Sequence, residues 1–120
     1  MARILVVDDS RTEIHVLKGM LEKAGYEVET ASSGEEGVET ARRARPDVIL
    51  MDVVMPGVNG FQATRQLSRD PQTAQIPVIM VTTKDQDADK VWAQRQGAKD
   101  YLVKPVREKE LLKAVRAQLS

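Results

Sequence analysis

Short apolar runs in this sequence end in residues that could do chemistry. These residues are Asp8, Asp9, Asp52, Thr82 and Lys104. Three carboxylates brought close together repel one another, and a hard divalent cation such as Mg2+, with Mn2+ as the alternative, relieves that repulsion through oxygen ligands. A lysine ammonium adds a positive charge, and a hydroxyl can donate to an anionic oxygen. An acidic nucleophile, a metal and a lysine suit phosphoryl transfer, in which catalysis is mostly positioning and charge neutralisation.

Asp52 is the anomalous member of this set, because it interrupts the apolar stretch 48–55. Such a short apolar run, bounded by polar residues and by Pro56-Gly57, is typical of a strand buried on both faces of a parallel sheet. A carboxylate inside that strand would lose its hydration at a large cost in free energy. We therefore expect Asp52 at the carboxyl end of the strand, where a crevice can hold water, cations or a ligand.

Strands and helices are predicted to alternate along the chain. Four further strands are expected at residues 4–7, 26–30, 78–81 and 101–103, of which 26–30 alternates apolar and polar residues as an edge strand does. Helices are expected over about 11–24, from Ser33 to before Pro46, from Asn59 to Asp70, from a cap at Asp85 or Asp87 to Gly97, and over a closing stretch with Leu111, Leu112, Val115 and Leu119 on its apolar face.

This alternation predicts a single α/β domain over residues 1–120. Mostly apolar strands favour a five-stranded parallel sheet with five helices covering both faces, and a polar-patterned second strand at an edge fits the doubly wound order 2-1-3-4-5. All strands of such a sheet end at the same rim. The five chemically active residues are therefore expected to meet there.

Composition excludes several classes of protein. The 18 basic and 18 acidic residues cancel and form no basic block, so nucleic acid is not an expected partner. The chain has no cysteine, and its first residues contain too few apolar positions for a signal peptide or a membrane span. We expect a cytoplasmic protein with no membrane contact.

Several marks match one family. They are the pair Asp8-Asp9, Asp52 followed by Met55, Pro56 and Gly60, then Thr82, Tyr101 and Lys104-Pro105. With them the chain resembles, from Ile4 to the last helix, the receiver domain of two-component response regulators, which has a CheY-like, flavodoxin-like fold. The resemblance implies that Asp52 accepts a phosphoryl group from a phosphohistidine of a sensor histidine kinase. It implies a phosphorylation-controlled switch, not an enzyme beyond self-phosphorylation and self-dephosphorylation.

The resemblance also assigns roles around Asp52. Asp9 and Asp52 would ligate Mg2+ directly, together with the backbone carbonyl of Val54, and Asp8 would act mainly through water. Lys104 and Thr82 would hold the phosphoryl oxygens.

The remaining marks concern the readout of phosphorylation. Tyr101 would change rotamer as Thr82 moves toward the phosphate, and the peptide bond between Lys104 and Pro105 would be cis, as X-Pro bonds permit. A protein effector, whose identity the sequence does not give, would bind the face formed by the fourth helix, fifth strand and fifth helix.

Within the family, residues 60–67 and 90–98 look like the stand-alone receivers of type IV pilus chemosensory systems, the PilH-like group. This likeness implies a role in twitching motility and no output domain. One departure from many receivers is Thr83, because a small residue usually follows the hydroxyl residue at position 82.

Other functions stay open as alternatives. A receiver can act as a phosphate sink for a shared kinase or as a flagellar chemotaxis regulator, and the sequence hardly separates these from the switch. An aspartyl-phosphate phosphatase of the haloacid dehalogenase type would need a second Asp at position 54, where this chain has Val54. His15 is expected at the surface without a role, and Trp92 as a partly exposed anchor for a partner.

Overall fold

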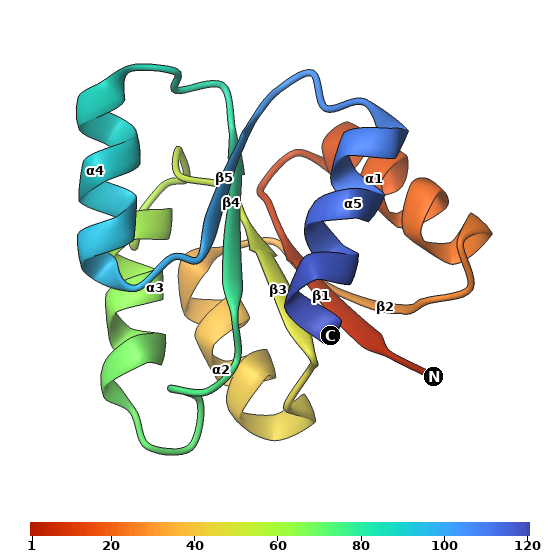
Figure 1. The fold of residues 1–120 in the computed structure, drawn as a ribbon. Helices are drawn as coiled ribbons and strands as arrows, with labels where there is room; N and C mark the ends of the chain where they lie inside the picture. Colours follow the sequence, from red (N-terminus) through yellow and green to blue (C-terminus); the bar gives the residue numbers. More distant parts are fainter.

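Five parallel strands form the central layer of the computed structural model, which describes residues 1–120 (Figure 1). The strands are Arg3–Val7 (β1), Glu27–Ala31 (β2), Val48–Met51 (β3), Val78–Thr82 (β4) and Asp100–Val103 (β5). They pair in the order β2-β1-β3-β4-β5, and every pairing is parallel. The predicted fold class and strand order are confirmed.

Helices cover both faces of this sheet. They are Arg11–Lys23 (α1), Gly34–Ala44 (α2), Gly60–Arg69 (α3), Asp87–Gln96 (α4) and Glu108–Leu119 (α5). Figure 1 shows α1 and α5 on one side of the sheet and α2, α3 and α4 on the other. None of the five has the length and apolar character that a membrane span requires.

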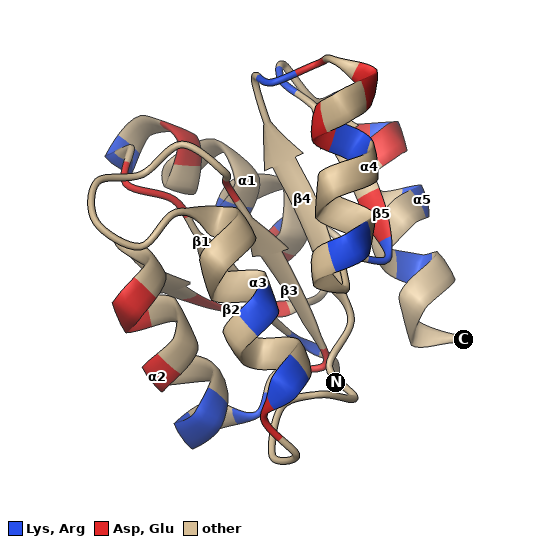
Figure 2. Ribbon diagram, turned by 90° about the vertical axis from the view of Figure 1, so that its left-hand side faces the viewer, with Lys and Arg blue, Asp and Glu red and all other residues tan.

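Strand composition follows strand position. β3 and β4 are buried along their whole length and appear without charged residues in Figure 2, since both of their faces lie under helices. β2 pairs only with β1 and carries Glu27 and Glu29 on exposed or half-buried positions, as an edge strand can. The expected edge position of this strand is confirmed.

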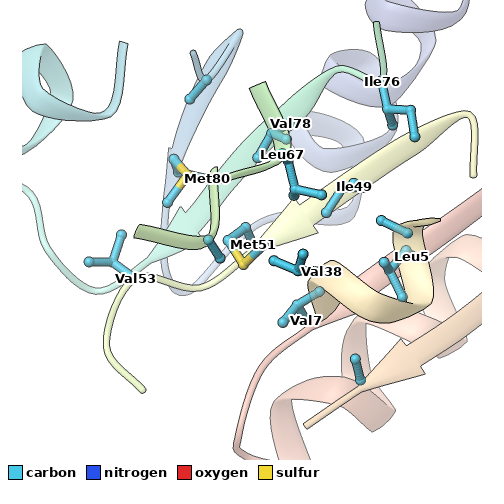
Figure 3. Packing of buried hydrophobic residues seen from close by; sticks show 14 of the residues in the cluster. Leu5, Val7, Val38, Ile49, Met51, Val53, Leu67, Ile76, Val78 and Met80 are labelled. Carbon is cyan, nitrogen blue, oxygen red and sulfur yellow. The ribbon is translucent and has the colours of Figure 1, made fainter. Parts of the chain in front are cut away.

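Side chains of alternate strand residues pack into two separate hydrophobic cores, one on each face of the sheet. Leu5, Val7, Ile49 and Met51 pack beneath α2, α3 and α4, where Val38 and Leu67 close the layer (Figure 3). The intervening residues face α1 and α5, among them Ile4, Val6, Val48 and Leu50. This division is the two-residue period of a strand applied to a sheet covered on both sides.

Three of the predicted helix starts are capped as expected. Ser10 accepts from the Glu13 amide at 3.3 Å, Ser33 from the amide of the third helical residue at 3.1 Å, and Asn59 from that of Gln62 at 2.9 Å. In each case a side-chain oxygen satisfies an amide that the first helical turn leaves free.

The expected start of α4 is wrong by one position. Its cap residue is Gln86, not Asp85 or Asp87, and Asp87 is already helical. The Gln86 amide donates to the Asp89 carboxylate at 3.3 Å, so the acidic side chain that stabilises this end lies inside the helix.

The C-terminal elements are partly exposed. β5 begins at Asp100 and forms the second edge of the sheet, so Leu102 is its only buried residue and Tyr101 is half-buried. Leu119, predicted on the apolar face of α5, is 36% exposed because it lies at the end of the last helix. Leu111 and Val115 are buried as predicted.

Gly60 allows α3 to begin directly against the loop that follows β3. Its amide donates to the Val53 carbonyl at 2.9 Å, and a Cβ at this position would overlap the carbonyl oxygen of Asp52 and lie 2.8 Å from the Val53 Cα. Any other residue would push the helix away from the segment that carries Asp52.

We expect Gly60→Ala to lower the free energy of unfolding by at least about 2 kcal/mol, because the added methyl group meets backbone that cannot give way. Gly19→Ala is the matched control. It adds the same group inside α1 with nothing within 4 Å, so it should stabilise the protein by about 0.5–1 kcal/mol. Urea unfolding curves measure both changes, and equal effects of the two substitutions would contradict the close approach at Gly60.

Candidate functional site

Strand register brings the predicted site residues to one rim of the sheet. Val7 pairs with Met51, so the next residues, Asp8 and Asp52, leave neighbouring strands side by side. Thr82 likewise pairs with Val103, the residue before Lys104. Backbone hydrogen bonds hold the ends of these strands together. The Asp52 amide donates to the Val7 carbonyl at 3.0 Å, and the Lys104 amide donates to the Thr82 carbonyl at 2.8 Å.

The three carboxylates form a compact group. Asp8, Asp9 and Asp52 each offer an oxygen within 4.8 Å of the other two. Asp8 and Asp52 are buried, whereas Asp9 is exposed at the mouth of the site. Two backbone amides orient the buried pair: that of Ser10 donates to Asp8 Oδ1 at 2.9 Å and that of Val53 to Asp52 Oδ1 at 2.8 Å. The sequence-based expectation that these carboxylates meet is confirmed.

Lys104 contacts both buried carboxylates of the acidic group. Its Nζ is 2.6 Å from Asp8 Oδ2 and 3.5 Å from Asp52 Oδ2, with the lysine side chain only 9% exposed. The following bond to Pro105 is cis, as predicted. A buried ammonium within reach of two buried carboxylates offsets their mutual repulsion.

Burial and neighbouring charges shift the titration of both central groups. Burial raises the pKa of Asp52, and the Asp8 charge adds to that rise, while Lys104, the Thr82 hydroxyl and the Val53 amide oppose it. Burial alone would lower the pKa of Lys104, but the bond to Asp8 and the charges of Asp52, Asp8 and Glu13 outweigh it, so the pKa is raised. Lys104 is therefore a permanent cation next to a destabilised carboxylate.

The donor set fits a hard divalent cation. Carboxylate oxygens from Asp8, Asp9 and Asp52 are the ligands that Mg2+ and Mn2+ prefer, and negative charge in excess of one ammonium remains to be neutralised. Asp8 is in direct contact with Lys104, which restricts one of its oxygens. Val54 follows β3 on the exposed loop at the same rim, with its side chain 57% exposed.

Thr82 and Tyr101 link the site to the loop before α4. Thr82 is fully buried, and its hydroxyl accepts from the Lys84 amide at 3.4 Å. The Tyr101 hydroxyl donates to the Lys84 carbonyl at 2.8 Å. Both predicted readout residues therefore contact the same residue of this loop, which also pairs with Asp89 of α4 at 3.7 Å.

Val54 and Lys84 border a shallow depression beside the site. Its other lining residues include Asn59 and Phe61. Val54 and Lys84 each lie two residues beyond a site residue, Asp52 and Thr82 respectively. His15 is exposed on α1 and contacts none of the site residues by hydrogen bond or ion pair, and Trp92 is 47% exposed, as predicted.

Sequence reasoning missed Glu13 as a neighbour of the site. Its spacing from Ser10 is that of a capping box, which predicts that the Glu13 carboxylate turns back to the helix cap. In the structure Glu13 Oε2 lies 3.9 Å from Lys104 Nζ instead. The only signal in the sequence was its position in the first helical turn after the Asp8-Asp9 pair.

The Tyr101 phenol should titrate far above the ordinary range. Burial, helped by the charges of Asp89, Asp85 and Asp52, raises its pKa from 10.0 to about 12. The folded protein then holds this proton more tightly than the unfolded chain, so the stability it contributes is complete below pH 10 and is lost as the pH rises toward 12. We expect the difference between the alkaline ultraviolet titrations of wild type and Tyr101→Phe to show one phenol ionising at about 12. A difference curve centred at or below the ordinary value would contradict the effect of partial burial and of the neighbouring carboxylates on this phenol.

Comparison with known proteins agrees with the geometry. The model of the response regulator receiver domain matches residues 4–116. Protein PilH of Pseudomonas aeruginosa is 62% identical over 120 residues, covering 100% of this chain and 99% of that protein. Among solved structures, the chemotaxis protein CheY4 of Vibrio cholerae is similar with a TM-score of 0.92 and 38% identity, covering 98% of both chains.

A further structure bears on the acidic group. The receiver domain of a sensor histidine kinase from Pseudomonas aeruginosa is 31% identical, with a TM-score of 0.91 over 98% of this chain and 97% of that one. That structure has a magnesium ion coordinated in its active site cleft. The rim of carboxylates and lysine, the strand order and the match along nearly the whole sequence agree, and the chain belongs to the response regulator receiver domain family.

Proposed function

We propose that this protein is a phosphorylation-controlled signalling switch in the cytoplasm, in which Asp52 accepts a phosphoryl group from a phosphohistidine of a sensor histidine kinase. The observation that carries the proposal is the ammonium of Lys104, which lies 2.6 Å from Asp8 and 3.5 Å from Asp52 beside an open acidic mouth at Asp9. Such a pocket combines a nucleophilic carboxylate with the charges that phosphoryl transfer requires.

The proposed transfer step uses these groups together. A carboxylate oxygen of Asp52 attacks phosphorus, the bond from phosphorus to the imidazole nitrogen breaks, and the imidazole leaves with the bonding electrons. Asp9, Asp52 and the Val54 carbonyl would hold Mg2+, with Asp8 behind them, and the cation would neutralise charge on the phosphoryl oxygens. Lys104 and the Thr82 hydroxyl bind those oxygens on the product.

The signal would leave the site through the loop before α4. Thr82 and Tyr101 both contact Lys84, so movement of Thr82 toward a phosphoryl group would change the contact that holds the Tyr101 ring. Lys90, Gln94 and Tyr101 line a hollow between α4 and β5, on the face of α4, β5 and α5 proposed for a protein effector. Val91 and Trp92, 48% and 47% exposed elsewhere on α4, offer further apolar area to such a partner. This exposed apolar pair favours an effector-binding switch over a phosphate sink.

The pathway is proposed from similarity. The likeness to PilH over the full length favours twitching-motility control over flagellar chemotaxis. The aspartyl-phosphate phosphatase is disfavoured because Val54 stands where that chemistry needs a second Asp. Chemistry beyond self-phosphorylation and self-dephosphorylation is not part of the proposal.

Incubation with a small phosphodonor and Mg2+ should add one phosphoryl group to the wild type, because Asp52 is the carboxylate placed beside Lys104. Asp52→Asn keeps the shape and removes the nucleophile, so it should add none. Intact-protein mass spectrometry measures both. An unmodified wild type, or equal labelling of Asp52→Asn, would refute the assignment.

Mg2+ should raise the free energy of unfolding by about 2.7 kcal/mol at a concentration about one hundred times Kd, since only the folded chain assembles the carboxylates. Asp9→Ala should remove most of that gain, whereas Asp85→Ala, which also removes an exposed carboxylate, should keep it. Thermal unfolding with and without Mg2+ measures the change. A full gain in Asp9→Ala would place the cation elsewhere.

A further inference from the structure

Glu13 forms an ion pair with Lys104, the same lysine that contacts Asp8 and Asp52. It is the third residue of α1, and its Oε2 lies 3.9 Å from Lys104 Nζ, with the glutamate side chain 40% exposed. The same nitrogen contacts Asp8 at 2.6 Å and Asp52 at 3.5 Å. Three carboxylates from separate elements therefore act on one charge, and the third of them belongs to neither the acidic pair nor the phosphoacceptor.

The geometry of the first turn explains why Glu13 can reach the lysine. In a full capping box the glutamate carboxylate accepts from the backbone amide of the cap residue. Here that amide, of Ser10, donates to Asp8 Oδ1 at 2.9 Å, while the Ser10 hydroxyl accepts from the Glu13 amide at 3.3 Å. Asp8 thus takes the place of Glu13 at the cap, and the only ion pair of Glu13 is with Lys104.

A negative charge at this position has two effects of the same sign. It adds to the field that attracts a cation to Asp8, Asp9 and Asp52, and it offsets part of the Lys104 charge that opposes that cation. For an anion entering the pocket both effects reverse. The carboxylate repels the anion and competes with it for the ammonium.

We propose that Glu13 is a positioning residue of this pocket, which strengthens divalent cation binding and restrains Lys104 from moving to a phosphoryl group on Asp52. The second half of this statement rests on the proposed function; the first half concerns cation binding alone. Glu13 touches neither the reacting atoms nor the carboxylate group directly, and acts through Lys104.

The alternative role for an acid in the first turn is stabilisation of the helix through its dipole. Glu110 provides the matched control, because it is the third residue of α5, is exposed and forms no ion pair. Glu13→Gln and Glu110→Gln make the same chemical change at the same helical position. A dipole effect alone would lower the melting temperature of both in the absence of cation and leave cation affinity unchanged.

The deciding experiment is calorimetric titration of each full-length variant with Mn2+ at low ionic strength. We expect Glu13→Gln to raise Kd by about two- to fivefold, the range of a partly exposed charge pair, and Glu110→Gln to match the wild type. The inference is overturned if Glu13→Gln binds Mn2+ as tightly as the wild type, if Glu110→Gln weakens binding equally, or if the wild type binds no Mn2+.

Phosphorylation by a small anionic donor at saturating Mg2+ tests the restraint on Lys104. Glu13→Gln should be labelled faster than the wild type, and a rate equal to or below the wild-type rate would overturn this half of the inference. A wild type that takes no phosphoryl group at all overturns the proposed function and with it the restraint, whereas the Mn2+ titration still decides the effect on cation binding.

Discussion

The ion pair between Lys104 and Asp8 is the interaction on which the rest of the site depends. Asp8 and Asp52 are two buried carboxylates just beyond adjacent strands, so they would repel each other strongly, and a single ammonium in contact with both offsets this repulsion. Together with Asp52 the group keeps a net negative charge, and burial and the Asp8 charge raise the pKa of Asp52 although Lys104 opposes the rise. The remaining repulsion between the carboxylates is relieved by a bound divalent cation.

The scaffold makes this arrangement possible by separating packing from chemistry. Inside the sheet, β3 and β4 contain no charge and feed two apolar cores on opposite faces. Charged groups begin one residue beyond the last ladder position, at Asp8 and Asp52, which are still buried, and Asp9 beside them is exposed. Gly60 brings the start of α3 against this edge and so fixes the loop that contains Val53. The apolar core thus holds the reacting groups at the rim of the sheet, next to the exposed carboxylate of Asp9.

Coupling to a distant surface requires an element that touches both places. Lys84 meets this condition, since its amide donates to Thr82, its carbonyl accepts from Tyr101 and its ammonium pairs with Asp89 at the start of α4. These contacts lie at an edge of the sheet, where β5 has only one neighbouring strand. An edge is the part of the fold with the fewest packing constraints, and it is a suitable position for a group that changes contacts.

The sequence by itself determined the order of elements, the sheet topology and the meeting of Asp8, Asp9, Asp52, Thr82 and Lys104. It could do so because the spacing of apolar residues predicts the strands and helices, and because the carboxyl ends of parallel strands all lie at one edge of the sheet. It did not determine the cap at Gln86 or the contact of Glu13 with Lys104. Those features were decided by the tertiary structure, because each depends on which of several nearby donors and acceptors form a hydrogen bond or ion pair in the folded chain. The Ser10 amide donates to Asp8 and not to Glu13, so the Glu13 carboxylate is free to reach Lys104 in the folded chain.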